Sequence, residues 1–285
     1  MRFAICNELL DDRPLDDAFR LIAETGYQAV ELAPYTLTDA SGTVSPERVE
    51  DVRRLLSRYS LGVTGLHWLL AGTIDLHVGA AEPDRRQRTL SHLRMLTRLC
   101  SDLGGRVLVF GSPAQRSTPP GATQADTLAR ATEVFADWGE TARELGMTVC
   151  LEALPTAETD LLNTTQQVID VVRCIDSPAV RMVLDVKSMS DERHPVPQLI
   201  QLAAPYFTYF QANDANRGGP GFGSTDFVPI FQALSEVGYD GDVSVEAFDK
   251  SPGPETVARK SLAYLRESAQ QAARTTITTD EGTAP

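Results

Sequence analysis

The sequence has little basic charge and no cluster of lysine and arginine. It carries 26 basic residues against 39 acidic ones, which gives a formal net charge of −13. Duplex nucleic acid is bound by clustered basic side chains that displace counterions from the phosphates, and an anionic membrane surface attracts the same clusters. We therefore expect neither nucleic acid nor a membrane as a partner.

The sequence also lacks long hydrophobic runs and a secretory leader. No apolar run approaches the ~18 residues of a membrane span, and the opening MRFAICNELLDD turns acidic too early for a signal peptide. The four cysteines, Cys6, Cys100, Cys150 and Cys174, fit no zinc-binding spacing. Each stands among apolar residues, so we expect buried, reduced thiols and a cytoplasmic protein.

What the sequence does have is a regular alternation of short β-rich runs and longer helical patterns. The runs cover residues 2–6, 29–33, 62–68, 106–110, 148–154, 180–186, 206–214 and 242–248. The helical patterns cover residues 14–25, 46–59, 83–103, 123–145, 164–175, 196–203, 227–237 and 253–268. Eight β-then-α units predict one α/β domain, a single (β/α)8 TIM barrel, since parallel neighbours require helical crossovers. An open doubly wound sheet is disfavoured because no GxGxxG follows the first run.

The last residues differ in composition from the rest of the chain. After Ala269 the sequence reads QQAARTTITTDEGTAP, which is polar, rich in threonine and without an apolar face. We therefore assign residues 1–271 to the barrel and 272–285 to a polar C-terminal tail. Such a tail is either loose or packed on a partner subunit, which leaves a homo-oligomer open.

Carboxylates inside apolar runs are the most informative feature. Glu152, Asp185 and Glu246 each interrupt a run that otherwise reads as core, and Gln211 stands at the matching place in the seventh run. The chemistry of a TIM barrel lies at the carboxyl ends of its strands, so these four side chains should converge. Any one of them alone is equally well explained as a helix cap or an ion-pair partner.

A divalent cation would remove the repulsion among three converging carboxylates. Three carboxylates and an amide oxygen form an all-oxygen set, which suits Mn²⁺ or Mg²⁺ better than zinc. Gln211 then has a role, because its amide oxygen can coordinate a hard cation in the place of a histidine nitrogen. His67, near the end of the third run, is a weaker candidate and could equally be a core histidine.

These motifs resemble the sugar phosphate isomerase/epimerase group of the xylose-isomerase-like TIM-barrel superfamily. The pieces that carry the resemblance are CLEALPTAETDLLNT, LDVKSM, NRGGPGFGSTDF and YDGDVSVEAFD, and it extends from Met1 to Ser268. The superfamily includes ketose 3-epimerases, hydroxypyruvate isomerases, inosose dehydratases and endonuclease IV. The resemblance implies one divalent ion, Mn²⁺ in preference to Mg²⁺ or Co²⁺, held by Glu152, Asp185, Gln211 and Glu246.

The sequence departs from the epimerase pattern at two positions. Gln211 stands where the epimerases have histidine and is similar to the hydroxypyruvate isomerase branch. Ser188 stands where they have a second histidine, three residues after Asp185. The intervening Lys187 has the strand parity of Asp185 and could reach the site. With four histidines in the chain, the histidine-rich three-metal site of endonuclease IV is disfavoured.

The resemblance also implies a mechanism. Glu152 and Glu246 would flank the reacting carbon next to a carbonyl, one removing a proton and the other returning it, while the metal stabilises the enediolate. The substrate would be a sugar, a keto-sugar or a small hydroxy-keto acid. The expected substrate contacts are His67, Trp68, Glu158, Lys187 and Arg217.

Two other functions remain open at this stage. A lyase could use the same metal site to dehydrate a keto-cyclitol or to eliminate across an oxidised sugar. A barrel that binds a sugar without turnover is favoured by the two missing histidines and disfavoured by the intact Glu152 and Glu246. We also expect the glycine-rich loop at residues 216–224 to order over the substrate, with a rigid turn as the alternative.

Overall fold

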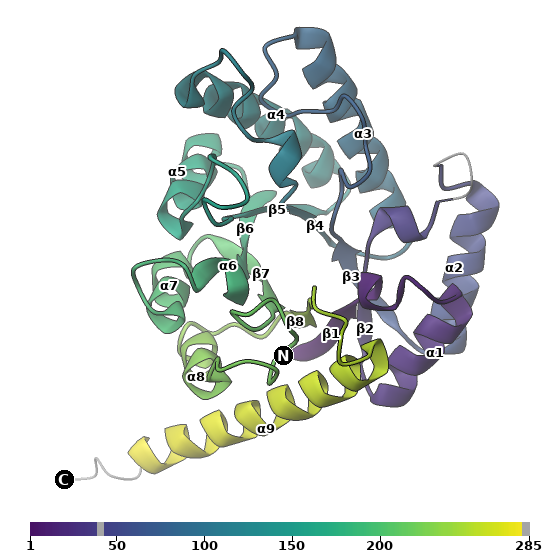
Figure 1. Ribbon diagram of the computed structural model, residues 1–285, viewed down its shortest axis with the longest axis vertical. Helices are drawn as coiled ribbons and strands as arrows, with labels where there is room; N and C mark the ends of the chain where they lie inside the picture. The colour runs from purple at the N-terminus through teal and green to yellow at the C-terminus, as the bar shows by residue number, and fades with distance from the viewer. Residues whose placement is uncertain (39–42, 281–285) are drawn as a thin grey trace.

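The computed structural model describes residues 1–38 and 43–280, with the side chains of residues 275–280 excepted. Eight parallel strands form a closed barrel in chain order, and β8 pairs with β1 through the register Ile5↔Val245 (Figure 1). The strands are β1 Arg2–Cys6, β2 Ala29–Leu32, β3 Gly62–Leu66, β4 Val107–Phe110, β5 Thr148–Glu152, β6 Val180–Asp185, β7 Phe207–Ala212 and β8 Asp242–Val245. The expected (β/α)8 barrel is confirmed.

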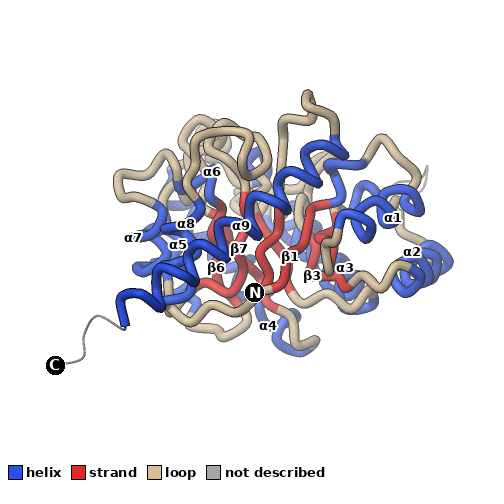
Figure 2. Tube along the Cα trace, turned by 90° about the horizontal axis from the view of Figure 1, so that it is seen from below, coloured by secondary structure: helices blue, strands red, loops and turns tan. Residues whose placement is uncertain are grey.

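Helices surround the strands on the outside of the barrel (Figure 2). They are α1 Leu15–Thr25, α2 Pro46–Arg58, α3 Pro83–Asp102, α4 Gln124–Glu144, α5 Thr165–Ile175, α6 Val186–Met189, α7 Val196–Ala203, α8 Phe227–Glu236 and α9 Pro254–Asp280. Short 3-10 turns follow three strands: η1 Asn7–Leu10, η2 Pro34–Thr36 and η3 Pro113–Gln115. Among the described residues, no helix is both long and apolar enough to cross a membrane.

Local sequence signals set the helix ends. Thr123 and Thr164 accept a hydrogen bond from the third backbone N–H of α4 and α5, as N-cap residues do. Gly26, Gly146 and Gly238 follow the ends of α1, α4 and α8 with φ of +101°, +65° and +73°. Only glycine adopts this left-handed backbone freely, so each of these helices stops and the next strand begins.

The barrel interior is a packed core with a polar end. Val109, Cys150, Val183 and Tyr209 form one apolar cluster inside the barrel, separate from the larger core between strands and helices. Alternate side chains of parallel strands fill the interior of a TIM barrel in layers. Polar side chains therefore gather at the end of the barrel where the strands stop and the long loops begin.

The structure differs from the sequence-based expectations in three places. Helix α9 continues to Asp280 instead of ending at residue 268, because no glycine or proline interrupts residues 255–280. Residues 281–285 of the expected tail lie outside the described residues. Cys174 is exposed, since the apolar stripe of α5 runs through other positions. Residues 186–189 form the short helix α6, so the strand-parity argument for Lys187 was wrong.

Candidate active site

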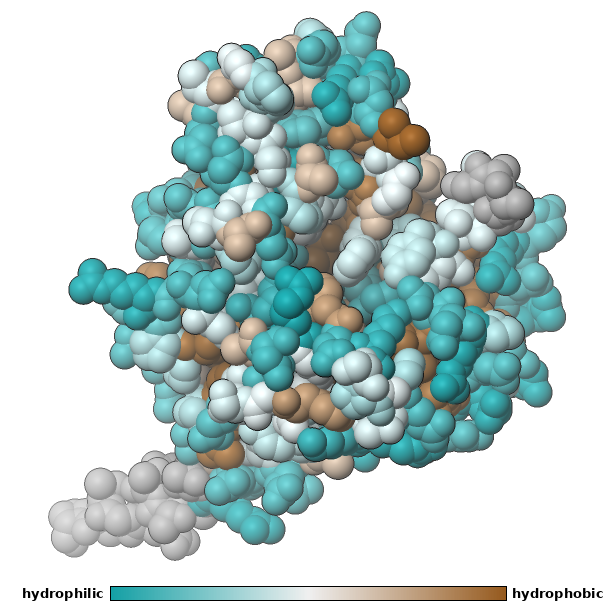
Figure 3. All heavy atoms as spheres, in the orientation of Figure 1, coloured by the Kyte–Doolittle hydropathy of each residue, from teal (hydrophilic) through white to brown (hydrophobic). Residues whose placement is uncertain are grey.

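A cavity of about 370 Å³ opens at the carboxyl ends of the strands. The face of the molecule in Figure 3 is hollowed near its centre, with hydrophobic atoms visible at depth. The cavity wall includes seven of the predicted site residues: His67, Trp68, Glu152, Glu158, Lys187, Arg217 and Glu246. The other two, Asp185 and Gln211, are buried at the ends of β6 and β7 and do not line the cavity.

Two small polar residues link the three predicted carboxylates. The hydroxyl of Ser188 contacts Glu152 Oε1 at 3.3 Å, and the backbone N–H of Ser188 donates to Asp185 Oδ1 at 2.8 Å. Asn213 Nδ2 donates to Asp185 Oδ2 at 2.5 Å and to Glu246 Oε2 at 3.5 Å. The carboxylates therefore occupy neighbouring positions around one end of the barrel, as their places in the sequence predict.

The pKa values of these three carboxylates are shifted in different directions. Burial, followed by the charges of Asp185 and Glu246, raises the pKa of Glu152 well above its ordinary value. Burial also raises the pKa of Asp185 to about 6. Burial alone would raise the pKa of Glu246, but His67 and Trp68 bring that pKa below its ordinary value. Negative charge at this end of the barrel is thus costly, and a bound cation would relieve the cost.

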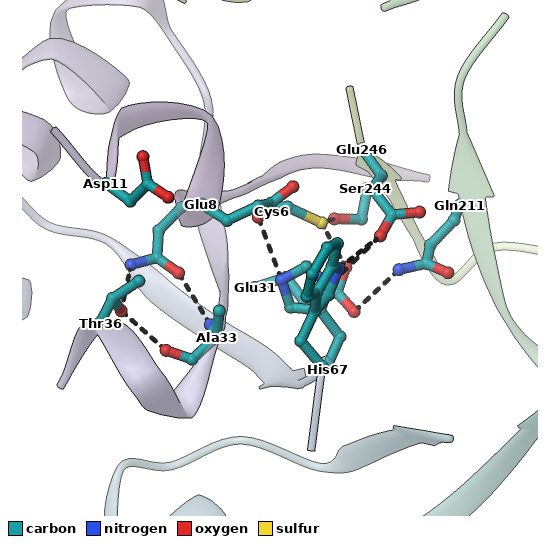
Figure 4. Close-up of polar contacts among 12 residues, drawn as sticks. Cys6, Glu8, Asp11, Glu31, Ala33, Thr36, His67, Gln211, Ser244 and Glu246 are labelled. Atoms are coloured by element: carbon teal, nitrogen blue, oxygen red, sulfur yellow. Dashed lines mark hydrogen bonds and ion pairs between the residues drawn. The ribbon is translucent and has the colours of Figure 1, made fainter. Parts of the chain in front are cut away.

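Gln211 contacts Glu31, a buried carboxylate on β2. Its Nε2 donates to Glu31 Oε1 at 3.2 Å, whereas its buried Oε1 has no hydrogen-bond partner among the described residues (Figure 4). An unpaired, buried amide oxygen is a free electron-pair donor. Together with the crowded carboxylates, this oxygen fits a hard divalent cation, and the assignment of the four ligands stays a prediction.

His67 is central to the two tightest clusters of metal-ligating side chains among the described residues. These clusters are Cys6–Glu31–His67 and Glu8–His67–Glu246, whose ligand atoms lie within 4.8 Å of one another. Glu152 and Asp185 are in neither cluster, so an ion shared with Glu246 would have to draw these carboxylates together. The ligand set predicted from the sequence includes neither Glu8 nor Glu31, and these clusters place both acids beside His67.

Both ring nitrogens of His67 lie within ion-pair distance of a carboxylate. Its Nε2 lies 3.1 Å from Glu8 Oε2 and its Nδ1 lies 3.4 Å from Glu246 Oε1, although neither nitrogen has the angles of a hydrogen bond. Burial lowers the pKa of His67, but the charges of Glu8 and Glu31 outweigh burial and raise it well above its ordinary value. The ring of His67 thus lies between Glu8 and Glu246.

A second charged group, formed by Glu158, Lys187 and Arg217, also lines the cavity. Glu158 Oε1 accepts from Lys187 Nζ at 2.9 Å and from Arg217 Nη1 at 3.1 Å. Both cations also stand over the ring of Phe248, at 5.0 Å for Lys187 and 4.6 Å for Arg217. The structure thus brings together three of the predicted substrate contacts, and Lys187 reaches the cavity from α6.

Three residues of the cavity wall have left-handed backbones. Trp68, Ser112 and Arg217 have φ of +54°, +45° and +71°. Such conformations are unfavourable for residues other than glycine and persist where the surroundings impose them, often at functional sites. At Trp68 the imposed backbone lets the indole Nε1 donate to Glu246 Oε1 at 3.1 Å while the ring stays 40% exposed.

Two further residues near Glu152 gave no signal in the sequence. Arg116 is fully buried and its Nη1 donates to the backbone carbonyl of Glu152 at 2.7 Å. Burial lowers the pKa of Arg116 to about 10. Gly111 leaves room for the carboxylate, because a Cβ there would lie 2.4 Å from Glu152 Oε2. Both residues come from the segment after β4, where no carboxylate or histidine marks the site.

The comparison with known families decides the family of the chain. Residues 19–268 match the family described as Xylose isomerase-like TIM barrel. The protein belongs to this family. The match covers most of the chain and confirms the resemblance and the fold that the sequence motifs predict.

Curated members of the family to which this chain is similar are sugar epimerases. An L-ribulose 3-epimerase from Mesorhizobium japonicum is 29% identical over 245 residues, which cover 85% of this chain and 78% of the relative. A 3-dehydro-D-guloside 4-epimerase from Escherichia coli is 23% identical over 273 residues, which cover 93% of this chain and 99% of the relative. These similarities support the assignment of the chain as an enzyme.

Solved structures of the family share the fold. A D-psicose 3-epimerase from Clostridium cellulolyticum, crystallised with D-tagatose, superposes with a TM-score of 0.84 at 20% identity. This superposition covers 94% of this chain and 99% of that chain. At this identity the likeness concerns the barrel and not the activity.

Proposed function

We propose that the protein is a divalent-metal-dependent sugar epimerase or isomerase that moves a proton on a carbon next to a carbonyl. The observation that carries this proposal is the placement of Glu152 and Glu246 in the wall of one cavity, from β5 and from the end of β8. Removing and returning a proton requires two such groups within reach of one carbon. The similarity to sugar epimerases supports the same reaction class.

Glu152, Asp185, Gln211 and Glu246 would hold the ion, and their four oxygen donors suit Mn²⁺ or Mg²⁺. The preference for Mn²⁺ over Mg²⁺ and Co²⁺ follows from the family resemblance alone. The ion supplies Lewis acidity that favours the enediolate form of the substrate. Glu152 and Glu246 carry the proton to and from carbon. Trp68 donates its indole N–H to Glu246 Oε1 and Asn213 donates to Glu246 Oε2, so both oxygens of this carboxylate are oriented by the protein.

The cavity walls favour a polar, carbohydrate-like substrate. His67, Glu158, Lys187 and Arg217 offer hydrogen bonds and charge, and the half-exposed ring of Trp68 offers a flat apolar surface for a sugar face. The substrates named for the relatives, ketoses and an oxidised glycoside, are the first candidates. A cytoplasmic location and a homo-oligomer remain part of this proposal.

A lyase is the second candidate, and Lys187 is the observation that favours it. Its ammonium lies in the cavity wall where the epimerase resemblance would place a histidine one residue later. Burial lowers the pKa of Lys187, but Asp185, Glu152 and Glu158 raise it above its ordinary value. A cation at this place could assist the departure of a hydroxyl group.

Proton exchange from D₂O separates these functions. The purified protein is loaded with Mn²⁺ and offered ketoses, 3-keto-glycosides and hydroxypyruvate, with product analysis by NMR and mass spectrometry. An epimerase or isomerase incorporates deuterium at carbon without loss of mass as water, whereas a lyase releases water. A protein that takes up no divalent metal and exchanges no substrate proton would contradict the proposal and favour a non-catalytic sugar-binding barrel.

A further inference from the structure

The amide of Gln211 is fixed from one side only. Its nitrogen donates to Glu31 at 3.2 Å, and Figure 4 shows a dashed line at that nitrogen and none at the amide oxygen. The two amide atoms branch from the same carbon, so the direction of the nitrogen sets the direction of the oxygen. That oxygen is buried and has no hydrogen-bond partner among residues 1–38 and 43–280.

Glu31 is itself held in a fully buried position on β2. Its Oε2 accepts from the phenol of Tyr209 at 2.9 Å and from the thiol of Cys6 at 3.1 Å, while its Oε1 accepts from Gln211. Tyr209 lies two residues before Gln211 on β7, so both side chains point to the same interior face. Three donors from two strands, β1 and β7, therefore fix the orientation of this carboxylate.

We propose that Glu31 is a positioning residue that decides which atom of the Gln211 amide faces the metal ion. An ionised carboxylate only accepts hydrogen bonds, so the amide nitrogen must turn towards it and the oxygen must turn away. The flipped amide would place two oxygens against each other and would offer the ion a nitrogen without a free electron pair. This inference rests on the proposed function, in which Gln211 is a ligand.

The test measures the affinity of the full-length, chelator-treated protein for Mn²⁺ alone, by calorimetry and by the electron paramagnetic resonance of free Mn²⁺. Glu31→Gln can both donate and accept, so it no longer selects one amide orientation. Loss of a partner that orients a metal ligand costs about 10- to 100-fold in metal affinity. We expect a loss of this size for Glu31→Gln and a smaller loss for Tyr209→Phe, which keeps the carboxylate but removes one of its donors.

Glu8→Gln is the matched control. Glu8 is also a buried carboxylate beside His67, but it does not contact Gln211. Glu8 belongs to the Glu8–His67–Glu246 cluster. Its substitution therefore measures how far the loss of one buried charge lowers Mn²⁺ affinity, and it also detects an ion bound in that cluster rather than at Gln211. An equal or greater loss for Glu8→Gln than for Glu31→Gln would overturn the positioning role.

The Gln211→Leu background separates the inference from the proposed function. If Glu31 acts through the amide, then Glu31→Gln costs no further affinity once Gln211 is Leu, and an additive loss contradicts the inference. If Gln211→Leu binds Mn²⁺ as tightly as the parent, the proposed ligand set fails. If Gln211→Leu binds weakly and Glu31→Gln binds as the parent does, only the positioning role fails. Circular dichroism and the metal-free melting temperature confirm that each variant is folded.

Discussion

Glu152 and Glu246 are buried carboxylates with different neighbours. The side chain of Glu152 accepts from the hydroxyl of Ser188, and its backbone carbonyl accepts from Arg116. Glu246 contacts the ring of His67 and the indole of Trp68. Two acids in unlike surroundings can exchange the roles of proton donor and acceptor across one carbon. Their separate environments thus suit a reaction that removes a proton and returns it.

Changing either carboxylate to its amide is expected to stop that exchange. Glu152→Gln and Glu246→Gln should each lower the rate of deuterium incorporation into the true substrate by at least ~10²-fold, the usual scale for a general acid or base. The measurement is made with Mn²⁺ in excess and with metal occupancy recorded for each variant. Parent-like turnover by either variant, with the ion bound, would sink the proposed mechanism.

Asp185 provides the contrast. It lies outside the cavity wall and accepts from Asn213 and from the backbone of Ser188, so it can hold an ion without touching the substrate. Asp185→Asn should therefore act through metal affinity, and activity should recover in part as Mn²⁺ is raised. A loss of turnover that excess metal leaves unchanged would place Asp185 in proton transfer instead.

The carboxylates and the glutamine at strand ends could be predicted from the sequence, whereas Glu8, Arg116 and Asn213, which follow strands, could not. Glu152, Asp185, Gln211 and Glu246 interrupt apolar runs, so their place at the end of a barrel follows from the pattern. Glu8 lies in the 3-10 turn η1 and Arg116 directly follows the 3-10 turn η3, and no periodicity in the sequence predicts the direction of such short turns. Asn213 lies just past β7, and its bridge between two carboxylates depends on the fold of neighbouring strands.

At the level of elements, the loop at residues 216–224 is packed more closely than its glycines suggest. A Cβ at Gly219 would lie 2.3 Å from Ser261 Oγ of α9, and one at Gly223 would lie 2.2 Å from Asp214 Oδ1. Asp214 also accepts from the backbone N–H of Gly223 at 2.8 Å. These glycines allow the loop backbone to pack closely against Ser261 and Asp214. This packing favours the rigid turn over a loop that orders on substrate binding.

Arg217→Ala tests what this loop does for the substrate. Arg217 is about half exposed, and its guanidinium contacts Glu158 at 3.1 Å beside the cavity. We expect kcat/KM on the true substrate to fall by about tenfold or more, the scale of one charged hydrogen bond, while metal content and melting temperature stay near those of the parent.

Arg259→Ala is the matched control for Arg217→Ala. Arg259 is also about half exposed and pairs with Glu255 at 3.0 Å on α9. An exposed pair of this kind contributes little to stability, so neither melting temperature nor kcat/KM should move. Equal activities of the two variants would show that Arg217 is a surface ion pair only. A change in proteolysis of the loop on substrate binding would restore the closure hypothesis.

Some ends of helices could be predicted from the sequence and others could not, as with the site residues. The three glycines after α1, α4 and α8 could be recognised because a helix, a glycine and an apolar strand follow one another in the sequence. The end of α9 could not be recognised, because threonine has a low helix propensity that packing contacts can outweigh. Ala272 is buried there, which extends the helix past the apparent end of the pattern.

At the scale of the whole molecule, barrel closure creates the site. β1 and β8 pair in register, which brings Glu8 and Glu246 to opposite sides of His67 although 238 positions separate the two acids. No segment of the chain contains the site, so the gathered negative charge exists in the folded state alone. An ion bound by that charge must therefore stabilise the fold, since the unfolded chain has no comparable site.

Melting temperature measures this linkage directly. At 100 times its dissociation constant, a ligand specific for the folded state adds about 2.7 kcal/mol of stability, which raises the melting temperature of a domain of this size by roughly 5 °C or more. We expect this rise when Mn²⁺ is added to chelated protein, and a much smaller one in Asp185→Asn. Asp240→Asn is the control, because Asp240 is exposed at the opposite end of β8 and should leave the rise unchanged. Two results would show that the ion does not bind where the strand-end carboxylates meet. One is a melting temperature of the parent protein that does not change with Mn²⁺, and the other is an Asp185→Asn variant that keeps the full rise.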